Sequence, residues 1–469
     1  MSRQARWTLA IVSVALFMTT LDNLVVSTAL PSIRASLGAS IESLEWTVNA
    51  YTLSFAVLLL TGAALGDRFG RRRMFLIGIA AFTASSAAAA LAPSTDALVA
   101  ARALQGAGAA LVLPLTLTLL SEAVNESQRG LALGIWSGVS GLGVALGPLV
   151  GGAVVSGISW EYIFWLNVPV GIALLPLAAR RLDESYGPDR ALDLPGLALA
   201  GSGLLGIVFG IVRGPALGWS STTILGSLVA GAVLLAAFVA WELHTPAPML
   251  PMRFFRSRAF AATNGVSLAM FFGAFGSIFL LAQFFQTAQG YSPLEAGLRT
   301  LPWTAMPIFV APVAGLLSDR IGSRPLMATG LALQSVAITW LAIVSEPTVA
   351  YSSLLIPFVL AGTGMALVFA PAANAVLGSV RAAEAGKASG ATNAIREVGG
   401  VLGVAVLASV FSSHGSYATP ATFNAGLTAA LPIGGAVLGA GALIALLVPA
   451  KKRRAERRDV PVAEPAAAA

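Results

Sequence analysis

Gly66-Asp67-Arg68-Phe69-Gly70-Arg71-Arg72-Arg73 is a short, densely charged turn between two long apolar segments of this 469-residue chain. A related turn, Ser318-Asp319-Arg320-Ile321-Gly322-Ser323-Arg324, separates two apolar segments in the second half of the chain. Glycine permits the tight backbone reversal that both turns need. The recurrence of the turn predicts that the chain folds as two halves of similar construction.

The apolar segments around these turns are long enough to cross a lipid bilayer, which takes about 20 mostly apolar residues. The chain is 57% hydrophobic and 10% charged, whereas a soluble domain has about 25% charged residues. Fourteen spans are predicted, at Trp7–Leu30, Leu44–Gly66, Met74–Ala92, Ala97–Leu120, Gly130–Val154, Tyr162–Ala179, Leu194–Val212, Thr223–Trp241, Phe260–Phe284, Ala296–Leu317, Leu326–Val344, Ser352–Leu377, Ala388–Phe411 and Ala425–Val448.

The expected fold class is therefore an all-α polytopic membrane protein. The two charged turns occupy equivalent places if the last six spans form a second half. We expect one six-helix bundle at residues 1–182, a second at 251–450, two inserted membrane helices with their loops at 183–250, and a basic tail at 451–469. Internal repeats of this kind are typical of secondary transporters.

Basic side chains lie mostly on one side of the predicted membrane. An even number of spans puts both termini on the same side, and the segments on that side carry 23 of the 28 Lys and Arg residues. Because such segments stay in the cytoplasm, we expect a multi-pass protein of the cell (inner) membrane with both termini cytoplasmic. The same distribution accounts for the net charge of +7 without a nucleic-acid partner. Arg3 and Arg6 resemble the start of a signal peptide, but the apolar run after them continues to Leu30 and predicts a span.

Residue types that other functions require are missing from the sequence. The chain has no cysteine and only two histidines, His244 and His414, so neither thiol chemistry nor a metal site is expected. No G-x4-G-K-[ST] loop occurs, which argues against ATP as the energy source. We see no nucleophile, metal cluster or paired carboxylates on facing spans, and therefore expect no enzyme, no catalytic residue and no cofactor.

The charged turn itself has two interpretations. Asp67, Arg68, Gly70, Arg71 and Arg72 can simply orient the protein by their positive charge. Alternatively, they form a cytoplasmic latch whose ion pairs hold two helices together in one of two states. The second occurrence of the pattern, at Asp319, Arg320 and Gly322, favours the latch.

Two ionisable residues fall inside predicted spans at similar depth. Asp22 lies in the outer half of the span Trp7–Leu30, and Arg102 lies in the outer half of the span Ala97–Leu120. Charged groups in such positions are costly and usually functional, and these two are predicted to pair. The structural alternatives are a carboxylate that stays paired in every state and an arginine bonded to backbone carbonyls.

Other polar and small residues inside the spans complete the candidate site. A run of small residues around Pro148 (Gly143, Gly147, Gly151 and Gly152) forms either a helix-packing face alone or a functional element, and the residue types favour neither. Side chains expected to line a central cavity are Asn49, Gln105, Asn264, Asn393, Arg396 and Glu397. Arg396 and Glu397 are adjacent, about 100° apart on a helix, and so cannot face the same point.

Five segments, in order, resemble motifs of the fourteen-span drug:proton antiporter family of the major facilitator superfamily. They are Leu21-Asp22-x4-Ser27-x-Ala29-Leu30-Pro31, Gly66-Asp67-Arg68-Phe69-Gly70-Arg71-Arg72, Arg102-x2-Gln105-Gly106-x-Gly108, Gly143-x3-Gly147-Pro148-x2-Gly151-Gly152 and Trp160-x2-Ile163-Phe164-x2-Asn167-x-Pro169-x-Gly171. The chain departs from the family at Ala63, where glycine is usual, and at Glu397, where glutamine is more frequent.

The resemblance implies a major facilitator fold and proton-driven efflux of drug-like or antibiotic-like small molecules by alternating access. Asp22 would carry the proton, Arg102 would modulate it, and the segment around Pro148 would be the antiporter motif. The partners expected are protons, a hydrophobic or cationic small molecule and the lipid bilayer, with the protein a monomer and the proton gradient its energy source. The alternative is a transporter of the same fold for a defined metabolite such as an amino acid, sugar or siderophore.

Overall fold

The computed structural model describes residues 1–187, 192–381 and 384–450, with no β-strand among them. Its helices are α1 (Arg3–Leu37), α2 (Ile41–Phe69), α3 (Arg71–Ala90), α4 (Thr95–Ala123), α5 (Glu126–Gly157), α6 (Tyr162–Trp165), α7 (Asn167–Arg181), α8 (Leu194–Leu217), α9 (Thr222–His244), the 3-10 helix η1 (Met252–Arg256), α10 (Arg258–Thr287), α11 (Pro293–Thr304), α12 (Met306–Ile321), α13 (Ser323–Val344), α14 (Tyr351–Leu377), α15 (Ala385–His414) and α16 (Pro420–Ala445). The basic tail predicted at 451–469 lies outside the described residues.

The described chain contains 14 helical segments long and apolar enough to cross a membrane, which confirms the predicted number of spans. Two of the segments are broken, which the sequence analysis did not predict. The first break separates α6 from α7 at Leu166, and the second separates α11 from α12 at Ala305. Each break lies two or three residues before a proline, Pro169 or Pro307. Proline has no N–H for the helical hydrogen bond and clashes with the carbonyl four residues earlier.

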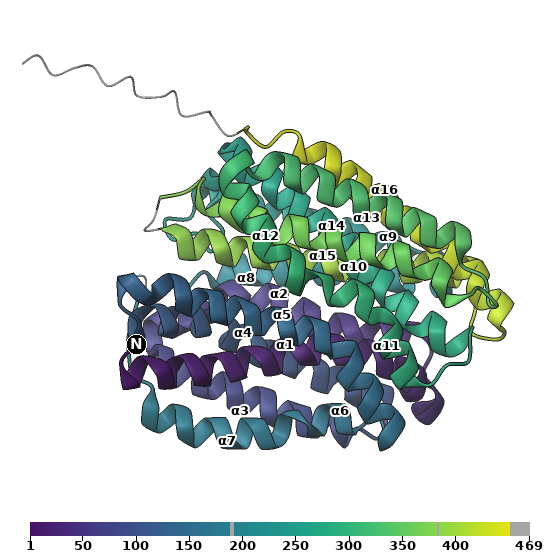
Figure 1. Cartoon of the computed structure of the whole chain (residues 1–469), viewed down its shortest axis with the longest axis horizontal. Coiled ribbons are helices and arrows are strands. Elements are labelled where there is room, and N and C mark those ends of the chain that lie inside the picture. Colours follow the sequence, from purple (N-terminus) through teal and green to yellow (C-terminus); the bar gives the residue numbers. More distant parts are fainter. Residues whose placement is uncertain (188–191, 382–383, 451–469) are drawn as a thin grey trace, which may run out of the picture.

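The helices form two groups of six spans and an inserted pair (Figure 1). The first group is α1–α7 and the second is α10–α16. The groups meet where α2 packs against α15 and α5 packs against α11. The inserted helices α8 and α9 pack on each other, and α8 also contacts both α2 and α15. The inserted pair therefore covers one of the two seams between the groups.

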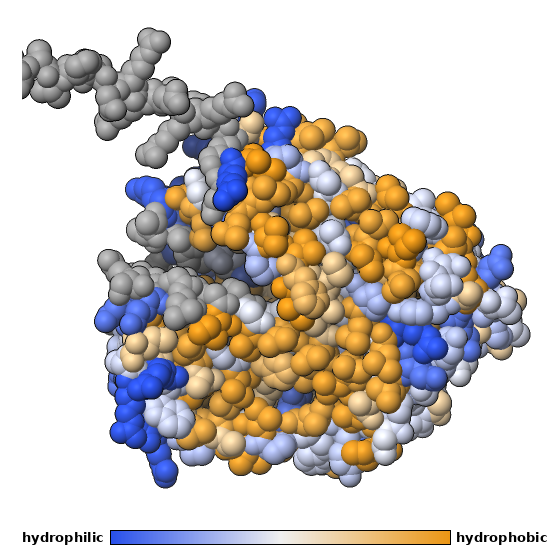
Figure 2. Space-filling view, in the orientation of Figure 1, coloured by the Kyte–Doolittle hydropathy of each residue, from blue (hydrophilic) through white to orange (hydrophobic). Residues whose placement is uncertain are grey.

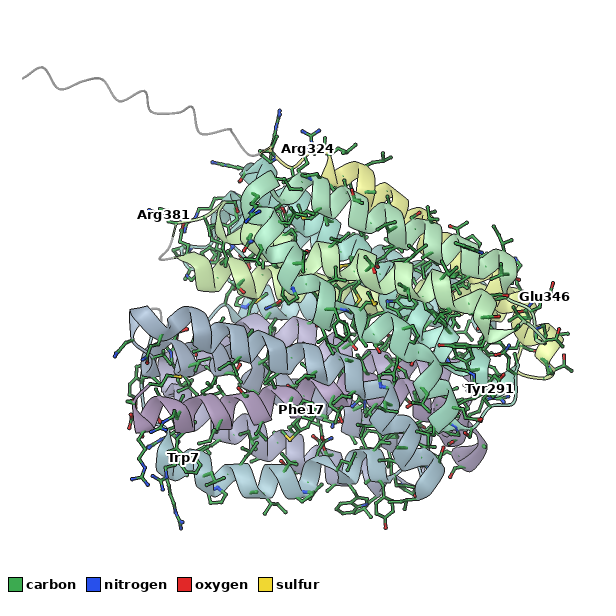
Figure 3. The ribbon with its side chains drawn as sticks, viewed as in Figure 1. Trp7, Phe17, Tyr291, Arg324, Glu346 and Arg381 are labelled. Atoms are coloured by element: carbon green, nitrogen blue, oxygen red, sulfur yellow. The ribbon has the colours of Figure 1, made fainter. Side chains whose placement is uncertain are left out.

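The two ends of the molecule are polar and the middle is apolar. Figure 2 shows an orange band between blue patches, as expected for a surface that faces lipid between two aqueous layers. Trp7 and Arg381 lie towards one end, here called the terminal end, and Tyr291 and Glu346 lie at the other, the far end (Figure 3). Neighbouring spans alternate in direction, so loops from α2 to α3 and from α12 to α13 both lie at the terminal end.

The apolar core connects the two groups at the far end. Val25, Val26, Ile33 and Leu44 of the first group belong to the same buried cluster as Phe285 and other residues of α10–α16. At the terminal end the clusters are separate. One contains Ile11, Phe75, Leu115, Leu119 and Leu174 of the first group, and another contains Phe254, Phe260, Val376, Ala388 and Ala391 of the second.

Hydrogen bonds between the groups follow the same pattern. Gln286 donates to the carbonyl of Thr28 at 2.9 Å, and the N–H of Leu294 donates to Oγ of Ser156 at 2.9 Å, both at the far end. Thr304 donates to the carbonyl of Ala145 at 3.3 Å nearer mid-depth. Towards the terminal end the two groups diverge (Figure 1). The structure is therefore closed at the far end.

Candidate functional site

The carboxylate of Asp22 is the centre of a buried polar cluster inside the first group. Its side chain lies in the middle of α1 and is 1% exposed. Oδ2 lies 2.6 Å from Nη1 of Arg102 on α4. Oδ1 accepts hydrogen bonds from the amides of Gln105 at 2.8 Å and Asn167 at 2.7 Å. The sequence predicted the pairing with Arg102, and the structure adds two neutral donors.

Arg102 makes further contacts of its own. Its Nη1 also donates to Oε1 of Gln105 at 2.7 Å, and its Nε donates to the carbonyl of Thr47 at 3.2 Å. The guanidinium lies over the ring of Tyr51, with Cζ 4.2 Å from the ring centroid. A lysine at this position would keep the charge but lose the fork of donors and the stacking.

Local sequence explains why these groups converge. Arg102 and Gln105 are three residues apart and therefore share one face of α4. Gly106 follows them, and a Cβ there would lie 2.2 Å from the carbonyl oxygen of Tyr51, so glycine allows α2 to approach closely. Asn167 is the first residue of α7, directly after the helix break, where its side chain is turned towards Asp22.

The sequence analysis did not predict Asn167 as a ligand of Asp22. It appeared only within the segment that resembles a family motif. Ser86 was missed as well, and its Oγ accepts a hydrogen bond from Gln105 at 2.8 Å. Both are neutral residues, and a neutral polar residue in an apolar run does not reveal its partner.

The charged turn between α2 and α3 forms ion pairs within the first group. Nε of Arg71 donates to Oδ1 of Asp67 at 2.8 Å, and the same guanidinium pairs with Glu122 at the end of α4. Gly70 has φ +107°, a backbone conformation that favours glycine. Arg68 is exposed, with its guanidinium over the ring of Phe69.

A distant carboxylate caps the helix that follows this turn. Glu184 accepts hydrogen bonds from the backbone N–H of Arg72 at 2.9 Å and of Arg73 at 3.2 Å. A negative charge at a helix N-terminus is stabilising, and here it also offsets three consecutive arginines. The turn is completed by the N–H of Gly187, which donates to the carbonyl of Asp67 at 3.1 Å.

The second turn has the same backbone form. Gly322 has φ +88°, and Oγ of Ser318 lies 2.9 Å from Oγ of Ser323. Arg320 is exposed. The side chain of Asp319 lies outside the part of the structure that is described.

The small residues around Pro148 bring α5 close to two neighbouring helices. A Cβ at Gly143 or Gly151 would lie 2.1 or 2.3 Å from the hydroxyl of Thr20 or Thr28 on α1. A Cβ at Gly152 would lie 2.3 Å from the carbonyl oxygen of Pro293 at the start of α11. Gly147 similarly meets Leu24, and Gly297 of α11 meets the carbonyl oxygen of Pro148. The segment is thus part of the closed far end.

The expected cavity residues do not gather at one point. Gln105 belongs to the Asp22 cluster. Asn264 donates to the carbonyl of Phe260 at 2.9 Å within its own helix. Asn49 is fully buried, and neither its amide nitrogen nor its oxygen has a partner among the described residues. It shares a face of α2 with Trp46 and Leu53, which pack towards α8 and α15.

Arg396 on α15 lies among aromatic rings. Its Cζ is 5.9 Å from the ring centroid of Phe271 and 5.7 Å from that of Phe369. Its Nη1 lies 3.3 Å from Oδ1 of Asn393. Nε of Arg396 and Oε2 of Glu397 are buried without partners among the described residues. These unsatisfied groups in the second group are available to a bound molecule or to water.

The sequence analysis also missed a polar cluster at the far end. Glu45 on α2 is 1% exposed. Tyr417, in the connection between α15 and α16, donates to Oε1 of Gln283 and stacks beneath Arg34 of α1, with Cζ 4.5 Å from its ring centroid. Burial raises the pKa of the Tyr417 phenol above its ordinary value, and the Glu45 carboxylate adds to this shift, whereas Arg34 and the bond to Gln283 oppose it. Glu45 of the first group and Tyr417 of the second are therefore close enough to interact electrostatically.

The family model described as Major Facilitator Superfamily matches residues 12–404, and it matches again over 263–465. The chain belongs to the major facilitator superfamily. Among superfamily members, it is 35% identical over 409 residues to the "Tetracenomycin C resistance and export protein" of Streptomyces glaucescens, covering 87% of this chain and 76% of that protein. It is 36% identical over 415 residues to the "Multidrug resistance protein Stp" of Mycobacterium tuberculosis, covering 88% of this chain and 77% of that one.

A solved structure shares the superfamily fold. The crystal structure of the POT family transporter PepTSo matches with a TM-score of 0.70 at 13% identity, covering 96% of this chain and 98% of that one. The predicted all-α major facilitator fold, with two six-helix groups and an inserted pair, is thereby confirmed.

Proposed function

We propose that this protein exports drug-like or antibiotic-like small molecules across the cell membrane in exchange for protons. Its relatives are named for resistance to, or export of, such compounds. In this proposal both termini are cytoplasmic, the far end faces outward, and the halves are residues 1–182 and 251–450 with the segment 183–250 inserted between them.

The observation that carries the proton part of the proposal is the Asp22 cluster. A carboxylate in the middle of a span, 1% exposed and held by one cationic and two neutral donors, is costly to bury and so implies a function. Proton binding would neutralise Asp22 and weaken its attraction to Arg102. Because these residues join α1, α4 and α7, a change at Asp22 would be transmitted to the packing of the whole first group.

Alternating access supplies the transport step. The shared core at the far end supports assignment of this structure to the inward-facing state. In the other state, the contacts of Gly152 and Gly297 would separate and the terminal end would close. The charged turn at Asp67 would act as a latch in this exchange, with Glu184 fixing the start of α3.

On the substrate side, the aromatic surroundings of Arg396 suit a flat, largely apolar molecule. Phe271 and Phe275 stack with centroids 5.0 Å apart, and Phe369 meets Phe271 edge to face. A bound ring can extend this set, while Asn393, Arg396 and Glu397 provide polar contacts for either charge.

A susceptibility panel in a host that lacks its own pumps tests the proposal. We expect the wild-type protein to raise resistance to at least one drug class, and Asp22→Asn to abolish that resistance at equal amounts in the membrane. Glu346→Gln, which changes an exposed carboxylate at the far end, is the matched control and should behave as wild type. Increased sensitivity on expression of the wild type would indicate uptake and contradict the proposal. Resistance retained by Asp22→Asn would remove Asp22 from the coupling step.

A further inference from the structure

A second buried carboxylate lies outside the Asp22 cluster, at the place where the two halves close. Glu45 occupies the second turn of α2 at the far end and is 1% exposed. Its Oε2 is buried without a hydrogen-bond partner among the described residues. A charged carboxylate that is buried without hydrogen-bond donors loses its hydration energy, and no protein contact compensates for that loss.

Among the described residues, no charged group forms an ion pair with Glu45, and the acidic neighbour Glu42 opposes its charge. Glu42, three residues earlier on α2, is acidic and is paired with Arg213 of α8. From the second half, Tyr417 presents a phenol. Arg34 of α1 directs its guanidinium onto the ring of Tyr417, with Cζ 4.5 Å from the centroid.

The partner surface in the second half is held by contacts of its own. Tyr417 packs against Phe411 and Phe423 with ring centroids 5.4 and 5.3 Å away, and its hydroxyl is bound to Gln283. Gln286, one turn further along α10 than Gln283, donates to the carbonyl of Thr28 in the first half at 2.9 Å. The far end thus closes by bringing a fixed aromatic and amide surface onto α1 and α2.

We propose that Glu45 is a second proton-linked residue, which permits the outer end to close only after it has taken up a proton. With the far end open, Glu45 is hydrated and can carry its charge. Closure removes that water, so the neutral carboxyl closes at lower cost than the charged one. Since the far end faces outward in the proposed function, on which this inference rests, the empty transporter would return inward only after loading a proton from outside.

The absence of cysteine from the sequence allows a direct test of closure. A single Thr28→Cys substitution places a thiol in the closed far end, where Thr28 is fully buried. The rate at which a membrane-impermeant maleimide labels this thiol in intact cells then reports opening of the far end. The reaction of maleimide with thiols itself depends on pH, so the rate is divided by that of an exposed single-cysteine variant, Glu346→Cys. We expect the corrected labelling rate of the Thr28→Cys protein to fall by about fivefold or more as the external pH is lowered from about 8 to about 5.5. A change of that size is typical of two coupled binding equilibria.

Adding Glu45→Gln, a permanently neutral side chain, should make labelling slow at every pH. Glu45→Asp should retain a pH response, which would show that the site tolerates substitution. Asp96→Asn, which neutralises an exposed carboxylate in the first turn of α4 at the far end, is the control and should respond as the parent does. A parental pH response in the Glu45→Gln protein would overturn the proposal, and so would fast labelling at every pH, because Glu45 would then be a structural contact.

This readout does not depend on transport. If Asp22→Asn abolishes export while the pH response of Thr28→Cys persists, the role of Glu45 stands alone. If Glu45→Gln removes the response in a protein that shows no proton-driven export, the gate is real and the proposed function fails.

Discussion

The side-chain amide of Asn167 lies 2.7 Å from Oδ1 of Asp22, so the first residue of α7 binds the carboxylate at the middle of α1. An amide can stabilise a carboxylate without competing for its proton. We therefore expect Asn167→Ala to remove one hydrogen bond from the ionised carboxylate of Asp22. A hydrogen bond to a charged group contributes about 1.5–3 kcal/mol, before the surrounding structure adjusts to its loss. The initial rate of proton-driven export, normalised to the amount of protein in the membrane, should therefore fall severalfold. Asn374→Ala, at an exposed site on α14, should leave the export rate unchanged.

Substitution of Arg102 tests whether the buried charges of Asp22 and Arg102 stabilise each other in the folded protein. Removing one partner leaves an unpaired buried charge, which typically costs about 3–5 kcal/mol. Arg102→Gln should therefore lower the midpoint of thermal unfolding in detergent, and the double variant Asp22→Asn, Arg102→Gln should recover most of that loss. Equal destabilisation of the single and double variants would show that Asp22 is not charged in the folded protein.

Asp67→Asn should reduce export severalfold with little change in the amount of protein in the membrane. The substitution removes one of the two carboxylates that hold Arg71, while Glu122 and the cap by Glu184 remain. Initial export rates, normalised to membrane protein, measure the effect. Asp183→Asn, in the exposed loop beside Glu184, serves as the control. Wild-type export by a well-inserted Asp67→Asn protein would reduce the turn to a signal for orientation.

Gly152→Ala should favour opening of the far end. The added methyl group would lie 2.3 Å from the carbonyl oxygen of Pro293, so α5 and α11 must separate to accept it. In the Thr28→Cys background we expect maleimide labelling to increase by about fivefold or more. Gly138→Ala, on the same helix, has nothing within 4 Å of the new Cβ and should label at the parental rate.

Reporter fusions at Met1 and at Ala469 should both indicate the cytoplasm. The basis is the concentration of basic side chains on that side of the 14 spans. A periplasmic or extracellular signal from either fusion would reverse the assignment of the far end as outward-facing.

The sequence predicted the pairing of Asp22 with Arg102 because charged residues in apolar spans are conspicuous and their depth can be counted along a helix. Asn167 could not be predicted as a partner, since its direction depends on a helix break that a hydropathy pattern does not reveal. Glu184 was missed for a different reason: it caps a helix that begins 113 residues earlier, and only the folded chain brings the two together.

Glu45 illustrates a further limit. It lies near the end of a span, where a carboxylate is ordinarily hydrated, yet it is 1% exposed in the folded chain. Its electrostatic neighbour Tyr417 lies in a connection far along the chain. Conversely, the residues expected to share a cavity were chosen for polarity alone. Asn49 shares a face of its helix with Trp46 and Leu53, which pack towards α8 and α15, and the amide nitrogen of Asn264 donates to the backbone of its own helix.

The continuity of the apolar core at the far end has a thermodynamic consequence. Opening that end to water exposes apolar surface, which raises the heat capacity, whereas the terminal end has already separated its clusters. The step that wets the far end should therefore have a free-energy cost that is curved in temperature. Since the penalty for wetting apolar surface weakens on cooling, low temperature should ease this step, while closure of the terminal end buries apolar surface and loses part of its driving force.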